Sequence, residues 1–327
     1  MTTQHNFIAG RLAPSPTGLL HLGNAWAFLL AWLACRAQKG RMILRMEDID
    51  PQRSRPDYAT AIIEDLVWLG LDWDEGPDIG GAHGPYVQSQ RTEMYRQAIE
   101  TLTQKGVVYP CFCTRRELKS LANAPHLEDT GPVYPGTCRH LPENERYRRI
   151  AAGQRYTLRC ACPEQTIVFT DAICGPQQLS PNDWGGDFAL RRSDGVIAYQ
   201  LAVALDDAEM GISQVVRGRD ILFSTPKQLL LLRLLGKKEP SQYAHIPLLM
   251  NASGERLAKR HQSLTLAHLR SLGLHPERLV GLLAFYAGLI PKIEEVAAAE
   301  LLSQFAFSKL PKEDLRISEL QLEDLLA

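Results

Sequence analysis

The stretch Arg11-Leu-Ala-Pro-Ser-Pro-Thr-Gly-Leu-Leu-His-Leu-Gly-Asn24 joins a short apolar strand, expected at residues 7–12, to a helix. Two prolines and a glycine end the strand. His21 and Gly23 then stand in the first helical turn, where backbone N–H groups are unpaired and the helix dipole is positive. Gly23 lets a flat ring approach the backbone, and Asn24 lies one turn from His21. The stretch therefore predicts a binding site for the phosphates of a nucleoside triphosphate, and the alternative is an ordinary strand-to-helix turn.

Four further motifs follow this stretch. They are Arg45-Met-Glu-Asp-Ile-Asp50, Tyr199-Gln-Leu-Ala-Val-Ala-Leu-Asp-Asp207, Val216-Arg-Gly-Arg-Asp220 and Arg256-Leu-Ala-Lys-Arg260. Together the blocks resemble the signatures of the class I glutamyl and glutaminyl tRNA synthetases, in the order of that family. His21-Leu-Gly-Asn24 then corresponds to the family's "HIGH" box, with Asn24 in place of its final histidine. The resemblance implies an ATP-dependent ligase that activates L-glutamate to glutamyl-adenylate, with Mg²⁺ accompanying ATP.

The composition is that of an ordinary globular protein. The chain has 327 residues, 45% hydrophobic and 22% charged, which leaves room for two or three domains. Its net charge of -1 excludes a global attraction to nucleic acid, so local basic clusters must hold an RNA partner. The longest apolar run, residues 25–35, is shorter than the about 20 residues that cross a bilayer. We expect no signal peptide, no membrane contact, a cytoplasmic location and a monomer.

Alternating strand and helix patterns indicate an α/β fold built on a doubly wound parallel sheet. The expected parts are the first half of the nucleotide-binding domain (1–107), a zinc-containing α+β insertion (108–190), the second half (191–252), and the signature loop with a small helical segment (253–327). In the second half the pattern predicts one helix over 220–235 and one strand over 243–250. Ligands of such a sheet bind at the carboxyl ends of its strands, where Arg11 and Glu47 stand.

The insertion has the cysteine spacing of a metal site. Cys111-Phe-Cys113 and Tyr134-Pro-Gly-Thr-Cys138 suit a tetrahedral site with three thiolates and one further ligand. On chemical grounds the fourth ligand is His140 or His126, because imidazole binds zinc better than a phenol does. Small bacterial members of the resembled family carry Cys-x-Cys and Tyr-x-x-x-Cys as zinc ligands. This resemblance implies one structural Zn²⁺ held by Cys111, Cys113, Tyr134 and Cys138, and the alternative is a set of scattered thiols without metal.

A second Cys-x-Cys element, Cys160-Ala-Cys162, lies downstream, followed by Cys174. Tyr156, Leu158, Cys160 and Cys162 alternate, which indicates the apolar face of a strand, where cysteine behaves as a small hydrophobic residue. We therefore expect these cysteines in the core. The odd total of seven, unevenly spaced, favours reduced thiols over a disulfide framework.

The glutamate site is assigned by the resemblance. The residues that it implies are Arg11, Ala13, Ser15, Glu47, Tyr199 and Arg217. In the family, the position of Glu47 faces the ammonium group and Arg11 contacts the amino acid, as a substrate with both charges requires. Arg217 is the expected partner of the side-chain carboxylate, since an always-charged planar fork best rejects glutamine. A surface ion pair between Arg217 and Asp220 is the alternative.

A polar loop, Asn251-Ala-Ser-Gly-Glu-Arg-Leu-Ala-Lys-Arg-His261, follows the last strand. It resembles the family's second signature, "KMSKS", with Arg256 for the first lysine and Ala258 for the serine. Lys259 keeps the position of a mobile charge that folds over the triphosphate. The implied catalytic residues are His21 and Lys259, and the implied ATP-binding residues are His21, Gly23, Asn24 and Lys259.

The RNA acceptor is predicted from the C-terminal part of the chain. Residues 261–327 suit a helical segment but leave no room for an anticodon-binding domain as well. The short C-terminal part and the cysteine pattern together resemble truncated bacterial members of the family that attach glutamate to queuosine in the anticodon of tRNA(Asp). The alternatives are an ordinary glutamyl-tRNA synthetase, a nucleotidyltransferase acting on a small metabolite, and an inactive paralogue that only binds nucleotide or RNA.

Overall fold

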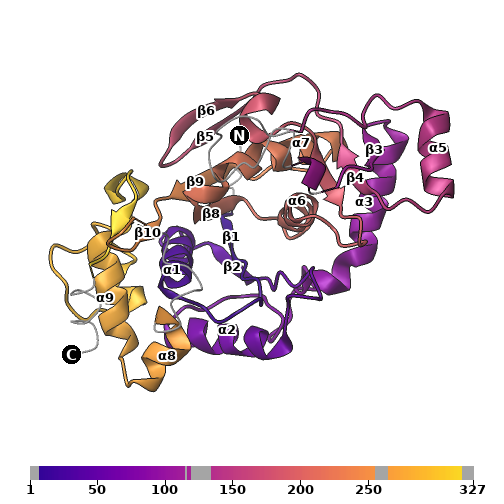
Figure 1. Ribbon diagram of the computed structural model, residues 1–327. Coiled ribbons are helices and arrows are strands. Elements are labelled where there is room, and N and C mark those ends of the chain that lie inside the picture. The colour runs from indigo at the N-terminus through magenta and orange to yellow at the C-terminus, as the bar shows by residue number, and fades with distance from the viewer. Residues whose placement is uncertain (1–6, 115, 119–133, 255–263, 319–327) are drawn as a thin grey trace.

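The parallel strands lie in the middle of the molecule, with the insertion at one end and the C-terminal helices at the other (Figure 1). The computed structural model describes residues 7–114, 116–118, 134–254 and 264–318. Within these ranges, the helices are all too short or too polar to cross a membrane. The predicted α/β class with a parallel sheet is confirmed.

The first half is a β–α–β unit followed by two helices. Its elements are β1 (Ala9–Leu12), α1 (Leu22–Arg36), β2 (Arg41–Leu44), α2 (Pro56–Trp68) and α3 (Thr92–Gln104). Helix α1 is apolar on nearly all faces and is therefore a core helix, packed against β1. A Cβ atom added to Gly10 would lie 3.0 Å from the Cβ of Cys35, so glycine permits this close approach.

The second half completes the sheet beside β1. Its elements are α6 (Tyr199–Glu209), β8 (Gln214–Gly218), the 3₁₀ helix η3 (Arg219–Ser224), α7 (Thr225–Leu235) and β9 (Gln242–Ile246). Strand β8 pairs in parallel with β9, and the Ser213 N–H donates to the Ala9 carbonyl at 2.9 Å, which joins β8 to β1. The strand order changes direction between β1 and β8. This is the switch point where open α/β sheets bind ligands.

Prolines divide two elements that the sequence pattern predicts as continuous. The helix expected over 220–235 begins as η3, and the α-helix starts only at Thr225, with Pro226 in its first turn. The strand expected over 243–250 is divided at Pro247, which has no N–H group for a ladder. Its second part is β10 (Leu249–Met250).

The insertion contains an antiparallel sheet and one exposed helix. Its elements are β3 (Val108–Cys111), α5 (Glu143–Ala151), β4 (Thr157–Cys160) and β7 (Phe188–Arg191). Helix α5 buries none of its residues and lies at the outer edge of the molecule (Figure 1).

One strand that lies within the predicted boundaries of the insertion (108–190) belongs to the main sheet. Strand β5 (Ile167–Asp171) pairs in parallel with β9, and β6 (Gly175–Leu179) pairs with β5. Ile167 packs in a buried cluster with Tyr243 of β9. The apolar pattern predicts a strand but does not determine its partner, which is why the sequence assigned residues 166–171 to the insertion.

The C-terminal segment packs on the first half, because residues of α1 and α9 share one hydrophobic cluster. Its elements are α8 (Leu266–Ser271), α9 (Pro276–Tyr286), the 3₁₀ helices η5 (Ala298–Leu301) and η6 (Phe307–Lys309), and β11 (Leu315–Arg316), which pairs with β10. Residues 319–327, at the end of the predicted helical segment, fall outside the described residues. So does most of the second signature loop, including Arg256, Ala258 and Lys259.

Candidate active site and metal centre

His21 is the N-terminal capping residue of α1. Its Nδ1 accepts a hydrogen bond from the Gly23 N–H at 3.1 Å, and the Asn24 Oδ1 accepts one from the His21 N–H at 3.1 Å. Because Nδ1 is an acceptor, the proton of a neutral imidazole lies on Nε2, which is then a donor. The predicted first turn is therefore present, with an imidazole beside its N–H groups.

A cavity of about 340 Å³ opens next to this turn. Its lining includes His21, Gly23 and Asn24 from the first turn of α1, and Gly218, Asp220, Ile246 and Leu249 from the second half of the sheet. The Trp26 indole also borders it and donates to the Pro247 carbonyl at 2.8 Å, which holds α1 against the chain after β9. The polar first-turn side chains form one part of the lining, while the rest combines apolar side chains with the Asp220 carboxylate. Polar and apolar surface together suit a ligand such as a nucleotide.

Buried charged side chains converge at the carboxyl ends of β1 and β2. The Arg45 guanidinium donates to Asp207 at 2.8 Å and to Glu47 at 3.1 Å. Arg11 forms an ion pair with Asp207 at 3.4 Å and donates to the Val216 carbonyl at 3.0 Å. Arg11 and Glu47 therefore lie in one buried network, as the strand-end argument predicts.

The two carboxylates of this network differ in their electrostatics. Burial raises the pKa of Glu47, although Arg45 lies beside it. Burial also acts to raise the pKa of Asp207, but Arg45 and Arg11 together hold it below its ordinary value. Asp207 is thus a fixed counter-charge for the arginines. Glu47 is the carboxylate that one more cation would stabilise.

Arg217 is buried and has neutral partners. Its Nε donates to the His245 Nε2 at 3.1 Å, its Nη1 to the Gln228 Oε1 at 2.9 Å and its Nη2 to the Thr225 Oγ1 at 2.8 Å. Within the described part of the chain, Arg217 forms no ion pair. Arg217 and Asp220 are both described, so the alternative ion pair between them is not formed. Two of its five N–H groups remain for a ligand.

The other predicted glutamate-site residues lie near this network. The Glu47 N–H donates to the Pro14 carbonyl at 2.8 Å, which places the Ala13–Ser15 segment against Glu47. Tyr199 begins α6 and is 38% exposed. Loss of water around its phenol raises its pKa, and the charges of Arg217 and Glu47 act on it in opposite directions. Tyr199 is therefore near enough to both Arg217 and Glu47 for their charges to act on its phenol.

Lys259 falls outside the described residues, but the chain after its loop returns to the same place. The Leu266 N–H donates to the Leu20 carbonyl at 2.9 Å, and Thr265 forms a bridge with His21. The segment that follows the second signature thus lies beside the first one.

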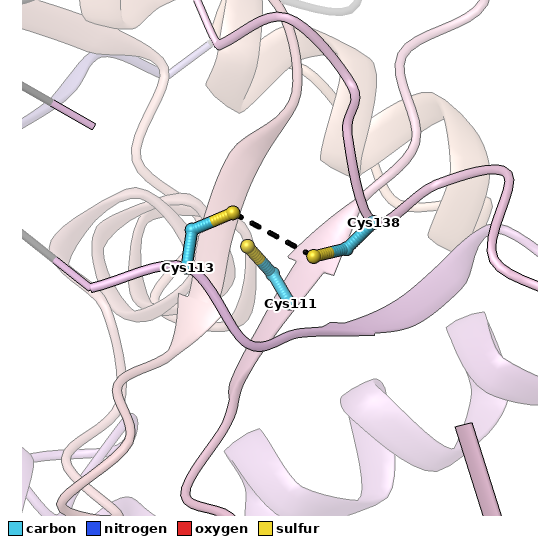
Figure 2. Close-up of side chains that lie close together, drawn as sticks. All are labelled: Cys111, Cys113 and Cys138. Atoms are coloured by element: carbon cyan, nitrogen blue, oxygen red, sulfur yellow. Dashed lines mark hydrogen bonds between the residues drawn. The ribbon is translucent and has the colours of Figure 1, made fainter. Parts of the chain in front are cut away.

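Three cysteines of the insertion converge on one point. Figure 2 shows the sulfur atoms of Cys111, Cys113 and Cys138 turned toward one another from two segments of the chain. All three lie within 4.8 Å of one another, and Cys113 and Cys138 are 3.6 Å apart. Two thiolates on one tetrahedral Zn²⁺ are about 3.8 Å apart, since Zn–S bonds are about 2.3 Å. The cluster can hold a metal ion.

Tyr134 lies beside the cluster. Its Oη is 3.3 Å from the Cys111 Sγ and 3.9 Å from the Cys113 Sγ. A hydrogen bond from Cys138 lowers the pKa of Cys111 to about 4, so one thiol is ready to ionise. Of the two histidines that are alternative fourth ligands, His140 is exposed and lies outside the cluster. His126 lies outside the described residues.

The second Cys-x-Cys element is part of the core, as the alternation predicts. Cys160 and Cys162 are buried in a cluster with residues of α3 and α6. Burial raises the pKa of Cys160 and keeps it a neutral thiol. All seven cysteines are free, in agreement with the expectation of reduced thiols.

Sequence reasoning missed several residues of the site. Arg45 and Asp207 stand inside quoted motifs, but no role was assigned to either. Asp171 and His245, which lie behind Arg217, belong to none of the motifs. The sequence contains a signal for Asp171 and His245, because each is a polar residue in a largely apolar strand. Buried polar groups are nearly always paired, so such residues indicate a buried hydrogen-bond partner.

Comparison with known proteins agrees with this geometry. Residues 8–321 match the family model described as tRNA synthetases class I (E and Q), catalytic domain. A Glutamyl-Q tRNA(Asp) synthetase of Nitratidesulfovibrio vulgaris is 55% identical over 94% of this chain and 95% of its own length. Glutamate–tRNA ligase 2 of Alkalilimnicola ehrlichii is 47% identical over 84% of this chain and 57% of its own.

The fold is shared with a solved structure. The crystal structure of the glutamate-tRNA synthetase from Elizabethkingia anophelis has a TM-score of 0.82 and 29% identity, covering 98% of this chain and 70% of that one. Its likeness extends over both the sheet and the insertion. Together with the sequence matches, it shows that the chain belongs to the class I glutamyl- and glutaminyl-tRNA synthetase family, in the branch of the glutamyl-Q tRNA(Asp) synthetases.

Proposed function

We propose that this protein activates L-glutamate with ATP and transfers the glutamyl group to queuosine in the anticodon of tRNA(Asp). The observation that carries the activation step is Arg217, a buried guanidinium with neutral partners at the switch point of the sheet. Burying an unpaired charge is costly. A ligand with a carboxylate in its side chain removes this cost, and glutamate is such a ligand.

The site offers one group for each charge of glutamate. Glu47 receives the ammonium group, Arg217 the side-chain carboxylate, and Arg11 helps to orient the molecule. The α-carboxylate is then directed at the α-phosphorus of ATP in the cavity beside α1. This step requires positioning and charge stabilisation rather than a protein nucleophile.

The phosphate groups have their own donors in this scheme. His21 Nε2–H and Lys259 stabilise the developing charge on the phosphate oxygens, while the Gly23 N–H holds the imidazole through its Nδ1. Mg²⁺ bound with ATP would supply further neutralisation of the negative charge on the pyrophosphate. The glutamyl-adenylate that forms is then open to attack by an RNA hydroxyl.

The choice of RNA acceptor rests on the match to glutamyl-Q tRNA(Asp) synthetases over nearly the whole chain. Queuosine carries a cyclopentenediol, whose cis-hydroxyl groups resemble those of a terminal ribose. An adenylate site built for one diol can therefore acylate the other. The phosphates of the anticodon stem would be held by local basic clusters.

The proposal is tested by transfer of radiolabelled glutamate to tRNA. We expect acceptance by tRNA(Asp) from queuosine-producing cells and none by tRNA(Asp) from cells that cannot make queuosine. Removing the terminal 3′ adenosine from tRNA(Asp) should leave acceptance unchanged, because the acceptor is in the anticodon. Charging of tRNA(Glu) at its 3′ end, independent of queuosine, would instead identify an ordinary glutamyl-tRNA synthetase.

We further propose that the cysteine cluster holds one Zn²⁺, with the Tyr134 phenolate as its fourth ligand. The spacing of Cys113 from Cys138, and of Tyr134 from Cys111, supports a closed four-ligand set. Such a set leaves no open coordination position. When bound, the ion supplies cross-linking of the insertion rather than chemistry on the substrate.

Elemental analysis of protein purified without chelator should find about one zinc per chain. Cys111→Ser and Cys138→Ser should each lose the metal and lower the melting temperature. Cys174→Ser, a half-buried cysteine outside the cluster, is the matched control and should keep it. Unchanged zinc content in both cluster variants would show that the ligands are wrongly assigned.

A further inference from the structure

Behind Arg217 lies a buried chain of hydrogen bonds that ends in a carboxylate. Asp171, at the end of β5, lies 2.6 Å from the Nδ1 of His245 on β9. The other ring nitrogen of His245 accepts from the Nε of Arg217 at 3.1 Å. Asp171 and His245 are nearly inaccessible to solvent, at 2% and 0% exposure. Three neighbouring strands thus contribute one residue each to a line from a fixed negative charge to the guanidinium.

The direction of each hydrogen bond follows from its partners. Asp171 also accepts backbone N–H groups of Ile173 at 3.0 Å, Cys174 at 2.8 Å and His245 at 3.0 Å, so its oxygens act as acceptors. Although burial opposes it, the bond to His245 holds the pKa of Asp171 below its ordinary value. The ionised carboxylate therefore fixes the ring proton on Nδ1. Nε2 is left as an acceptor that faces Arg217.

The same ring nitrogen lies 3.1 Å from the Thr225 Oγ1, which in turn accepts from Arg217 at 2.8 Å. Gln228 accepts from the remaining side of the guanidinium and donates to the Gln200 side chain at 3.2 Å. Burial lowers the pKa of His245 to about 4, so the imidazole is neutral near neutral pH. The guanidinium is consequently held by three neutral acceptors, and within the described part of the chain no carboxylate is hydrogen-bonded to it.

We propose that Asp171 and His245 are positioning residues that orient Arg217 and thereby set the discrimination of glutamate from glutamine. The inference rests on the proposed function, because it gives Arg217 the side-chain carboxylate of glutamate. A carboxylate in direct contact with Arg217 would neutralise it and compete with the substrate. The imidazole of His245, which lies between Asp171 and Arg217, orients Arg217 and keeps the negative charge of Asp171 out of direct contact with it.

The orientation is what excludes glutamine. Two N–H groups of Arg217 stay directed at the ligand, since the other three are already engaged. A carboxylate accepts from both. An amide accepts with its oxygen only, and its NH₂ group then faces an N–H donor, an arrangement that leaves buried donors unpaired.

Asp171→Asn tests the line with almost no change in shape. The new amide can donate to the His245 Nδ1, which moves the ring proton to Nε2. The Nε2–H of His245 then faces the Nε–H of Arg217, and the hydrogen bond between them is lost. We expect the KM for glutamate in pyrophosphate exchange to rise about tenfold or more, and the preference for glutamate over glutamine to fall by a similar factor. The KM for ATP should not change.

Variants of His245 separate positioning from packing. His245→Leu removes the acceptor and should raise the KM for glutamate as Asp171→Asn does. His245→Gln restores a carbonyl acceptor and should recover most of the loss. Thr225→Val, which has the shape of threonine, gives a second test if the His245 variants fold poorly. Tyr109→Phe is the control: it removes a buried hydroxyl-to-carboxylate bond to Asp187 in another sheet, and should alter stability without altering selectivity.

Two kinds of failure can be told apart by calorimetric titration of the wild-type protein with glutamate and glutamine. If the wild-type protein binds glutamate, and Asp171→Asn and Thr225→Val keep both its affinity and its selectivity, the positioning role is overturned and the proposed function stands. If the wild-type protein does not bind glutamate, the role of Arg217 falls, and both proposals fall with it.

Discussion

Replacing Arg217 with glutamine is expected to raise the KM for glutamate by a factor of about 10² or more, because truncating one partner of a buried charge pair typically costs several kcal/mol. The amide of glutamine can still bond with Thr225 or Gln228, so the fold should survive. It cannot balance the side-chain carboxylate of the substrate. Pyrophosphate exchange measured over a range of glutamate concentrations gives KM and kcat separately, and the KM for ATP should stay close to its wild-type value.

Arg219→Gln is the matched control for this variant. Arg219 lies two residues further along the chain and pairs with Asp314 at the surface, 3.4 Å away. Surface ion pairs of this kind contribute at most about 1 kcal/mol. The control should therefore activate glutamate normally. An unchanged glutamate KM in Arg217→Gln would contradict the role given to Arg217, whatever the effect on stability.

Replacing His21 with alanine is expected to lower kcat for adenylate formation by about 10², the typical cost of one donor directed at a transition-state oxyanion. Glutamate binding should persist, since its binding residues are untouched. Lys259→Ala, predicted from the second signature, should have an effect of the same order. The rate of pyrophosphate exchange at saturating glutamate and ATP measures both.

His268→Ala is the control for the histidine variant, because His268 is exposed on α8 and outside the nucleotide cavity. It should exchange pyrophosphate at the wild-type rate. A His21→Ala protein that keeps a near-normal kcat would remove this imidazole from the mechanism.

The amino-acid sequence predicts the parts of this protein that local chemistry determines. His21 caps α1 because a polar residue precedes an apolar helix at a strand-to-helix turn. Cys111, Cys113 and Cys138 meet because two short motifs in a loop-rich segment each bring thiols together. Arg11 and Glu47 lie in one buried network because each stands at or just beyond the carboxyl end of a strand, where neighbouring parallel strands bring their side chains together.

The parts that sequence reasoning missed depend on contacts between distant strands. Nothing near Ile167 indicates that β5 pairs with β9 rather than with the strands of the insertion. The line from Asp171 to His245 spans 74 positions and includes no motif. Neutral partners such as Gln228 resemble any polar residue of a helix until the structure places them against a guanidinium. Pairing between strands far apart in the chain, not local propensity, determined these features.

Because β1 packs beside β8, the proposed amino-acid site can form during synthesis only after β8 has been made. Arg11 donates to Val216, a residue 205 positions later in the chain. A ribosome adds about 5–20 residues per second, so about 10–40 s separate the synthesis of these two residues. Throughout that interval β1 has a neighbour on one side only. The two sides of the proposed amino-acid site are therefore brought together only after that interval.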